Sequence, residues 1–325
     1  MGFKALMAAL LGLVVTAHPG FNSAQAAEKV YRIGYLAPSA IYKPFRQALH
    51  DLGYVEGRNL KFEFRQARTN VQYKGLAEEL VRLNVDLIVA VGVRAVQEAK
   101  MATRTIPIVM ANASADPVKQ GLIESLARPG GNVTGVFDLL PDLAGKRVAL
   151  LKEVFPKLSR IAQIAPNPPG GTAVGPAHLR ATLEAARKLG IEVQDINVRR
   201  PEDLEDVFRT MAGSGVEAAV LVGVSFFVSH RNRIVQLAAK YRLPVIYTHL
   251  RWVPAGGLMA YTTDGDERLR RAAKHVDMIL NGKNPAEIPA EQPTRYVLEV
   301  NLKTARALGI AVPPSILFRA NRIIE

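Results

Sequence analysis

The stretch FRQALHDLGYVEGRNLKFEFR, residues 45–65, contains one complete helix-to-strand unit. Its first half carries apolar side chains at the i, i+3, i+4 and i+7 positions of one helix face: Phe45, Ala48, Leu49 and Leu52. Gly53 follows directly and is a natural stop signal for that helix. The second half, residues 60–65, is short and rich in aromatic residues, as is typical of a β-strand.

The same alternation of strand and helix continues along most of the chain. Five strands are expected before residue 140, at 31–36, 60–65, 85–91, 106–111 and 133–137. Five more are expected afterwards, at 160–165, 191–197, 218–222, 244–248 and 258–262. Apolar strands separated by amphipathic helices predict parallel sheets with helices on both faces. The fold class is therefore α/β, with doubly wound parallel sheets.

The strand series breaks near Pro141, after a Gly-rich passage at 129–135, which predicts two similar lobes. The late elements are a helix at 267–280, a strand at 296–300 and a short helix at 302–308. We expect them to cross between the lobes and form a hinge of several strands. The predicted division assigns 27–140 and about 264–290 to the N-terminal lobe, and 141–263 and about 291–325 to the C-terminal lobe.

The first 26 residues have the order of a secretory signal peptide. Lys4 precedes an apolar run at 5–17, and small residues end in Ala24-Gln25-Ala26. A short N-terminal anchor helix is the alternative, although the run is shorter than the roughly 20 residues that a membrane-spanning helix needs. The chain contains no cysteine, so no lipid-modified cysteine is available. We therefore expect a protein released into the periplasm.

The formal net charge of +13 raises the question of a nucleic-acid or membrane partner. The basic residues are, however, spread over many predicted helices. Only short clusters occur, such as Arg199-Arg200 and the group Arg268, Arg270 and Arg271. This pattern indicates a solvated positive surface that favours acidic ligands, and no nucleic-acid partner is expected.

The sequence contains none of the usual catalytic motifs. It has no GxSxG elbow, no phosphate-binding loop, no HExxH pair and no GxGxxG after the first strand. The six histidines lack metal-ligand spacing, which predicts surface or packing roles, with His249 as an exception because it directly follows a strand. We expect no metal, no cofactor and no enzymatic activity. A periplasmic enzyme is the alternative, since catalytic groups can come from distant loops.

Ligands of open parallel sheets bind beyond the carboxyl ends of the strands. The residues there are rich in exposed backbone and short polar groups, and they give these candidate ligand-binding positions: Ser39, Gly92, Val93, Asn112, Asp116, Asn167, Ser225, His249 and Asp264.

Several of these positions have two interpretations. Ser39 and the amides near Gly92 and Val93 are suited to a ligand carboxylate. Asp116 is suited to a ligand amino group, but it also precedes Pro117 at an expected helix start, where a capping role is sufficient. Ser225 is likewise a cap or a contact. Four aromatic residues offer pocket walls or, more simply, core packing: Phe226, Phe227, Tyr247 and Trp252.

Several passages resemble the substrate-binding proteins of ABC transporters, in the group that includes bacterial tryptophan-binding proteins. They are the 45–65 stretch, VDLIVAVG at 85–92, ADPVKQGLIESLARPGGNVTGV at 115–136, AGGLMAYTTD at 255–264 and the closing 301–325 segment. The resemblance implies a periplasmic binding protein of type I, whose two lobes close over a solute. It also implies that Ser39, Asp116 and Asn167 line the cleft. Val93 stands where the family often has a hydroxyl residue.

The function that this resemblance implies is the solute-binding component of an ABC importer. Its partners would be a small molecule, such as an amino acid or an aromatic or carboxylate metabolite, and a permease in the inner membrane. A protein that opens and closes is expected to be a monomer. A ligand-sensing receptor that signals to a membrane partner is the alternative, because the physics of binding is identical.

Overall fold

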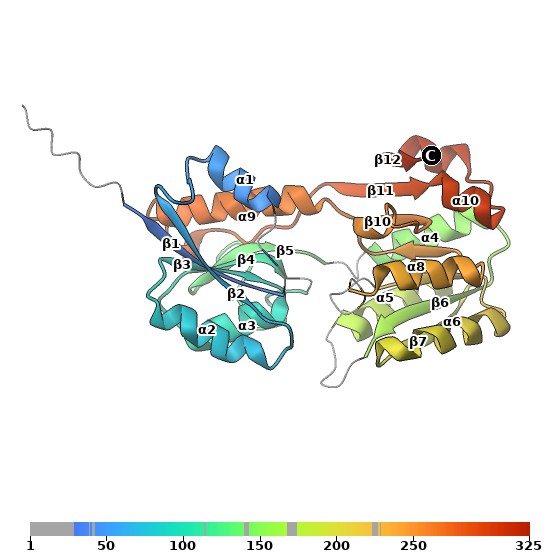
Figure 1. Ribbon diagram of the computed structural model, residues 1–325, viewed down its shortest axis with the longest axis horizontal. Coiled ribbons are helices and arrows are strands. Elements are labelled where there is room, and N and C mark those ends of the chain that lie inside the picture. Colours follow the sequence, from blue (N-terminus) through green and yellow to red (C-terminus); the bar gives the residue numbers. More distant parts are fainter. Residues whose placement is uncertain are drawn as a thin grey trace, which may run out of the picture.

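The computed structural model describes residues 29–38, 40, 43–113, 115–139, 143–167, 174–222, 227 and 229–325. These residues form two α/β lobes that lie side by side along the long axis of the molecule (Figure 1). The predicted signal peptide lies outside the described residues.

The first lobe is built on a parallel sheet with the strand order β2-β1-β3-β4-β5. The order reverses between β1 and β3, which makes that point the topological switch of the sheet. The strands have these bounds: β1 Tyr31–Ala37, β2 Leu60–Gln66, β3 Leu87–Val91, β4 Ile108–Ala113 and β5 Val133–Phe137.

Helices cover both faces of this sheet because the strands are apolar on both sides. Along β1, Ile33 and Tyr35 pack toward α1 (Lys43–Asp51) and α9 (Gly265–Leu280). Leu36 points to the opposite core, which contains residues of α2 (Gln72–Arg82) and α3 (Val93–Ala102). Leu52 was expected on the buried face of α1, and this prediction is wrong. Leu52 lies just beyond the end of that helix and is 39% exposed.

The second lobe repeats this order, as β7-β6-β8-β9-β10, and then adds two strands. The predicted doubly wound α/β class is therefore confirmed. Two details differ, since β11 pairs antiparallel with β10 and β12 was not expected. The strands have these bounds: β6 Arg160–Pro166, β7 Glu192–Val198, β8 Ala218–Leu221, β9 Val245–Tyr247, β10 Met259–Thr263, β11 Tyr296–Asn301 and β12 Arg322–Ile324.

Two helical layers enclose the second sheet. One core contains residues of α6 (Leu204–Gly213) and α8 (Arg231–Lys240). The core on the other face contains residues of four helices: α4 Ala144–Val154, α5 Val174–Lys188, α10 Leu302–Leu308 and α11 Pro314–Arg319.

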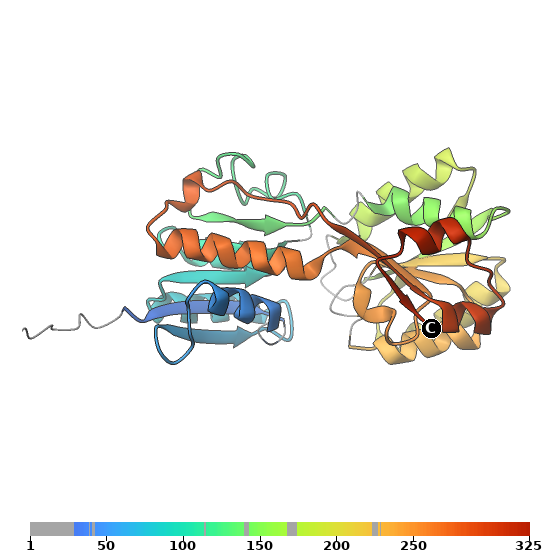
Figure 2. The ribbon, with the colours of Figure 1, turned by 90° about the horizontal axis from the view of Figure 1, so that it is seen from above.

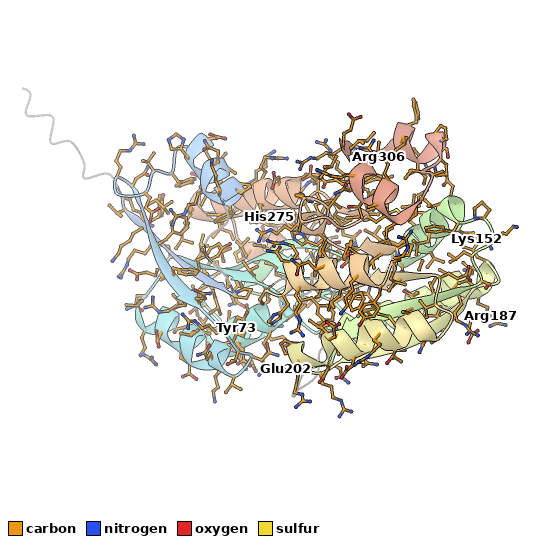
Figure 3. All side chains as sticks on the ribbon, turned by 45° about the vertical axis from the view of Figure 1, so that its right-hand side comes forward. Tyr73, Lys152, Arg187, Glu202, His275 and Arg306 are labelled. Carbon is orange, nitrogen blue, oxygen red and sulfur yellow. The ribbon has the colours of Figure 1, made fainter. Side chains whose placement is uncertain are left out.

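The chain passes between the lobes three times: from β5 to α4, from β10 to α9, and from the end of α9 back to β11 (Figure 2). The returning segment first pairs with β5, because Phe137 N donates to Glu291 O at 3.0 Å and Glu291 N donates to Gly135 O at 2.9 Å. It is also held to α9 by the buried His275 (Figure 3), whose Nε2 lies 3.0 Å from the carbonyl oxygen of Pro289. The lobe limits at 140, 263 and 290 remain predictions.

Gly135 gives the Gly-rich 129–135 passage a structural role in the first sheet. Its φ of +126° lies in the region that favours glycine, and a Cβ there would be 2.5 Å from the backbone nitrogen of Met110 on β4. Any side chain at this position would therefore push β4 and β5 apart.

We predict that Gly135→Ala lowers the free energy of unfolding by roughly 3 kcal/mol, from the steric and backbone strain. The measurement is urea unfolding followed by circular dichroism. Gly131→Ala is the matched control, because nothing lies within 4 Å of its Cβ position. Equal stability of the two variants would contradict the role assigned to Gly135.

His178 on α5 makes stability depend on pH. Burial, together with the nearby charge of Arg147, lowers its pKa to about 3. The imidazole is therefore neutral in the folded state above that pH, whereas the unfolded chain binds a proton near pH 6.5. The free energy of unfolding must fall as pH falls from about 6.5 toward 3.

We predict that His178→Leu removes part of this acid sensitivity, amounting to roughly 3 kcal/mol between pH 7 and pH 4.5. Denaturant unfolding at both pH values measures the difference. If the wild type and the variant lost equal stability on acidification, His178 would not be a source of the effect.

Candidate functional site

The carboxyl ends of the two sheets meet at the crossings between the lobes. Asp138 follows β5 directly and is 2% exposed, and its carboxylate accepts a hydrogen bond of 2.6 Å from the hydroxyl of Thr263 at the end of β10. Arg268, in the first turn of α9, donates from Nη1 to the same carboxylate at 2.8 Å. The parallel strands of the two lobes therefore end toward each other, whereas β11 and β12 run in the opposite direction (Figure 1).

A second arginine interacts electrostatically with this carboxylate. Arg147 of α4 is fully buried, and its Nε donates to the carbonyl oxygen of Tyr261 at 2.8 Å. Burial lowers the pKa of Arg147 to about 9, while the negative charge of Asp138 opposes that shift. Asp138 therefore compensates positive charge from α4 and from α9.

Gly92 and Val93 lie at the switch point of the first sheet. Gly92 precedes α3 with φ +97° and ψ +151°, and nothing lies within 4 Å of its Cβ position. Val93 begins α3, so the first amide groups of this helix point beyond the end of β3. This geometry provides partial positive charge and free N–H donors for an anionic group.

Asp116 has the capping role that its position before Pro117 suggested. Its Oδ1 accepts hydrogen bonds from the amides of Val118 and Lys119 at 3.0 and 3.2 Å. The segment that it caps is a turn at 117–121, not the start of a helix, which corrects that expectation. A contact between Asp116 and a ligand amine remains a prediction.

Asn167 and Asp264 follow strands of the second sheet. Asn167 is exposed after β6, and its backbone N–H donates to the carbonyl oxygen of Val198 at 2.8 Å. Asp264 after β10 is the N-cap of α9 and accepts from the amide of Asp266 at 2.9 Å. Asp264 thus has a structural role that the sequence analysis did not assign.

His249 follows β9 and precedes the 3₁₀ turn Leu250–Trp252. Its Nδ1 accepts a hydrogen bond from the amide of Arg251 at 3.2 Å. Burial, together with the charges of Arg251, Arg268 and Arg231, lowers the pKa of His249 to about 4. The imidazole is therefore neutral at pH 7, and with Nδ1 as acceptor the proton is on Nε2. His249 offers this donor to an acceptor at the strand ends.

Three candidate ligand-binding positions are not fully described. Ser39 and Ser225 lie outside the described residues, and for Asn112 only the backbone within β4 is described. Their predicted contacts with a ligand remain predictions.

Aromatic packing accounts for three of the four aromatic candidates. Tyr247 and Trp252 are stacked with ring centroids 4.9 Å apart, and both are buried in the core beside α6 and α8. Phe227 belongs to the same core, as the packing interpretation predicted. Phe226 lies outside the described residues.

The sequence analysis missed Asp138, Arg147 and Arg231, and it placed Arg268 on a solvated surface. The side chain of Arg268 is only 11% exposed, because it lies against Asp138 at the crossing. A signal was available for Asp138 and Arg231, since one follows a predicted strand and the other opens a helix.

No three His, Cys, Asp or Glu side chains are grouped as a metal site would require, within the part of the chain that the structure describes. Among the same residues, no helix is both long enough and apolar enough to cross a membrane.

The family model for ABC transporter substrate binding proteins matches residues 36–324. The chain belongs to this family. The fold that the resemblance implied, a periplasmic binding protein of type I, is thereby confirmed.

Two relatives within the substrate-binding family have names that mention a ligand. A tyrosine-binding protein of Clostridioides difficile is 28% identical over 269 residues, which are 82% of this chain and 76% of that protein. The structure of an ABC domain from Streptococcus pneumonia in complex with L-Trp is 25% identical, with a TM-score of 0.82, and the match covers 91% of this chain and all of the other.

A third protein supports the fold alone. The ligand-free, open structure of a substrate binding protein with adhesive properties from Clostridium difficile is 23% identical, with a TM-score of 0.68. The match covers 91% of this chain and 99% of that one.

We predict that Asp138→Asn lowers the free energy of unfolding by about 3 kcal/mol or more, because Arg268 and the buried Arg147 lose their compensating charge. Glu184→Gln is the control, since Glu184 pairs with Lys188 on an exposed surface and the change should cost less than about 0.5 kcal/mol. Urea unfolding measures both. A small effect at Asp138 would mean that the crossing does not depend on this charge.

Proposed function

We propose that this chain is the solute receptor of an ABC importer, that it is exported to the periplasm by residues 1–26, and that it acts there as a monomer. In this proposal it binds a small molecule between its lobes and presents the closed form to a permease in the inner membrane. Membership in the substrate-binding family supports this role over the alternative of a sensor.

The observation that carries the proposal is the meeting of the two carboxyl-terminal sheet edges at Asp138 and Thr263. Open parallel sheets bind ligands at these edges, and here the two edges face each other. A ligand held by donors from both lobes would stabilise the closed arrangement, because it interacts more strongly with that arrangement than with the open one.

We further propose that the ligand is an amino acid or an aromatic or carboxylate metabolite. The first lobe would bind a carboxylate through the amides at Gly92 and Val93, with Ser39 and Asn112 as further contacts. Asp116, Asn167, Ser225, His249 and Asp264 complete the proposed set. The relatives whose names mention tyrosine and L-Trp support a ligand of this size and class.

Binding without turnover is the chemistry that these groups favour. Asp138 is buried and accepts from Thr263 and Arg268 through Oδ2, and His249 uses Nδ1 to accept a backbone amide. Neither group is placed as a free base, so we propose that the ligand leaves the protein unchanged.

The test is mass spectrometry of small molecules released from the natively purified mature protein. We expect one unchanged metabolite, which should raise the melting temperature when added back and reduce the radius of gyration in X-ray scattering. Conversion of that metabolite to a product would contradict the receptor function. So would the failure of any released or added metabolite to stabilise the protein.

A further inference from the structure

Arginine and histidine side chains follow three successive strands of the second sheet. Arg231 opens α8 beyond β8, His249 and Arg251 follow β9, and Arg268 lies in the first turn of α9 beyond β10. All three arginines lie close enough to His249 to act on its ionisation. The group therefore lies together at the carboxyl edge of the sheet, where the proposed ligand site is.

Two guanidinium nitrogens in this group are buried without an acceptor. Nε of Arg231 and Nε of Arg268 have no hydrogen-bond partner among the described residues. Arg268 uses its Nη1 for Asp138, but Arg231 has no side-chain hydrogen bond or ion pair with any described residue. Burying an N–H donor without an acceptor costs free energy, so an acceptor from outside the chain would stabilise this arrangement.

The carboxylates beside this group already have partners. Asp138 is bound by Thr263 and Arg268, and Asp264 caps α9 and lies 3.6 Å from Arg295. Neither is left to balance Arg231. The amino-terminal end of α8 adds further partial positive charge at the same place.

The groups of this cluster that remain for a ligand are donors. A guanidinium Nε–H can only donate, and this holds for Arg231 and Arg268. The Nε2–H of His249 is also a donor, because Nδ1 of the same ring already accepts from the backbone amide of Arg251. An ammonium group next to the ligand's acceptor would meet like charges on the second lobe, where the carboxylates of Asp138 and Asp264 already have partners. In a free amino acid the ammonium group is attached to the carbon next to the carboxylate. Such a ligand would place its positive charge beside these arginines, which is unfavourable.

We infer that the ligand is an organic acid with a net negative charge, and that Arg231 and His249 on the second lobe, together with Arg268, bind its carboxylate. This inference rests on the proposed receptor function and narrows its ligand class. The expected ligand therefore differs in charge from tyrosine and L-Trp, the ligands in the names of two relatives, because both amino acids carry no net charge at neutral pH.

The test is a thermal-shift and calorimetry panel of benzoate, 4-hydroxybenzoate, phenylacetate, succinate and glutarate, with their amides, L-tyrosine and L-tryptophan as matched neutral compounds. Any metabolite released from the native protein joins the panel. We expect an acid to bind and its amide to bind at least tenfold more weakly. We also expect Arg231→Gln to weaken binding of that acid at least tenfold, without lowering the melting temperature of the free protein.

Arg233→Gln is the control on the same helix, because Arg233 is exposed and donates to the carbonyl oxygen of Pro201. It makes the same change in charge and should leave affinity within about twofold. Arg231→Lys should restore only part of the affinity, since it keeps the charge but lacks the Nε–H group.

Two results would overturn the inference. One is a neutral amino acid that binds more tightly than every acid; the other is an acid whose affinity is equal in Arg231→Gln and Arg233→Gln. Either result leaves the receptor function standing, because a ligand still binds. That function fails separately, if no compound binds at all.

Discussion

The buried carboxylate of Asp138 is the interaction on which the arrangement of the two lobes depends. It binds Thr263 at the end of β10 and Arg268 at the start of α9, and its charge compensates the fully buried Arg147 of α4. These groups belong to two of the three crossings. A single buried negative charge therefore holds the carboxyl ends of β5 and β10 together. Because the charges are buried, loss of either partner would cost several kcal/mol of stability, roughly 3–5.

The position of the proposed ligand site follows from this arrangement. Because the parallel strands of both lobes end toward the crossings, the proposed ligand contacts can be divided between the lobes. In the proposed site, the first lobe contributes backbone amides at Gly92 and Val93, which suit many anions. The second contributes the side chains of His249 and Arg231, so selectivity is expected to reside mostly there.

The fold could be predicted from sequence because it depends on local periodicity. Every predicted strand overlaps an observed one, since apolar runs between amphipathic helices have few alternative structures. The direction of β11 could not be predicted in this way. It depends on the path that the chain takes after α9, where pairing of Glu291 with β5 returns the chain toward β10 from the other lobe.

The candidate site was only partly accessible to the same reasoning. His249 was singled out because it follows a predicted strand, and it does lie after β9. Asn112 was chosen for the same reason, but that expectation is wrong, because β4 continues to Ala113 and includes it. The contact between Asp138 and Arg268 joins residues 130 positions apart, and no local pattern marks such a pair. Arg268 accordingly looked like one more exposed cation in a basic helix.

The position of α9 has a consequence for synthesis of the chain. This helix supplies Leu269, Ala272 and Val276 to one core of the first lobe, although more than a hundred residues of the second lobe precede it in the sequence. A chain emerging from the ribosome cannot complete its first lobe until nearly the whole second lobe has followed. Such late closure leaves apolar strands exposed during synthesis, when chaperones or a translocation channel can still engage them.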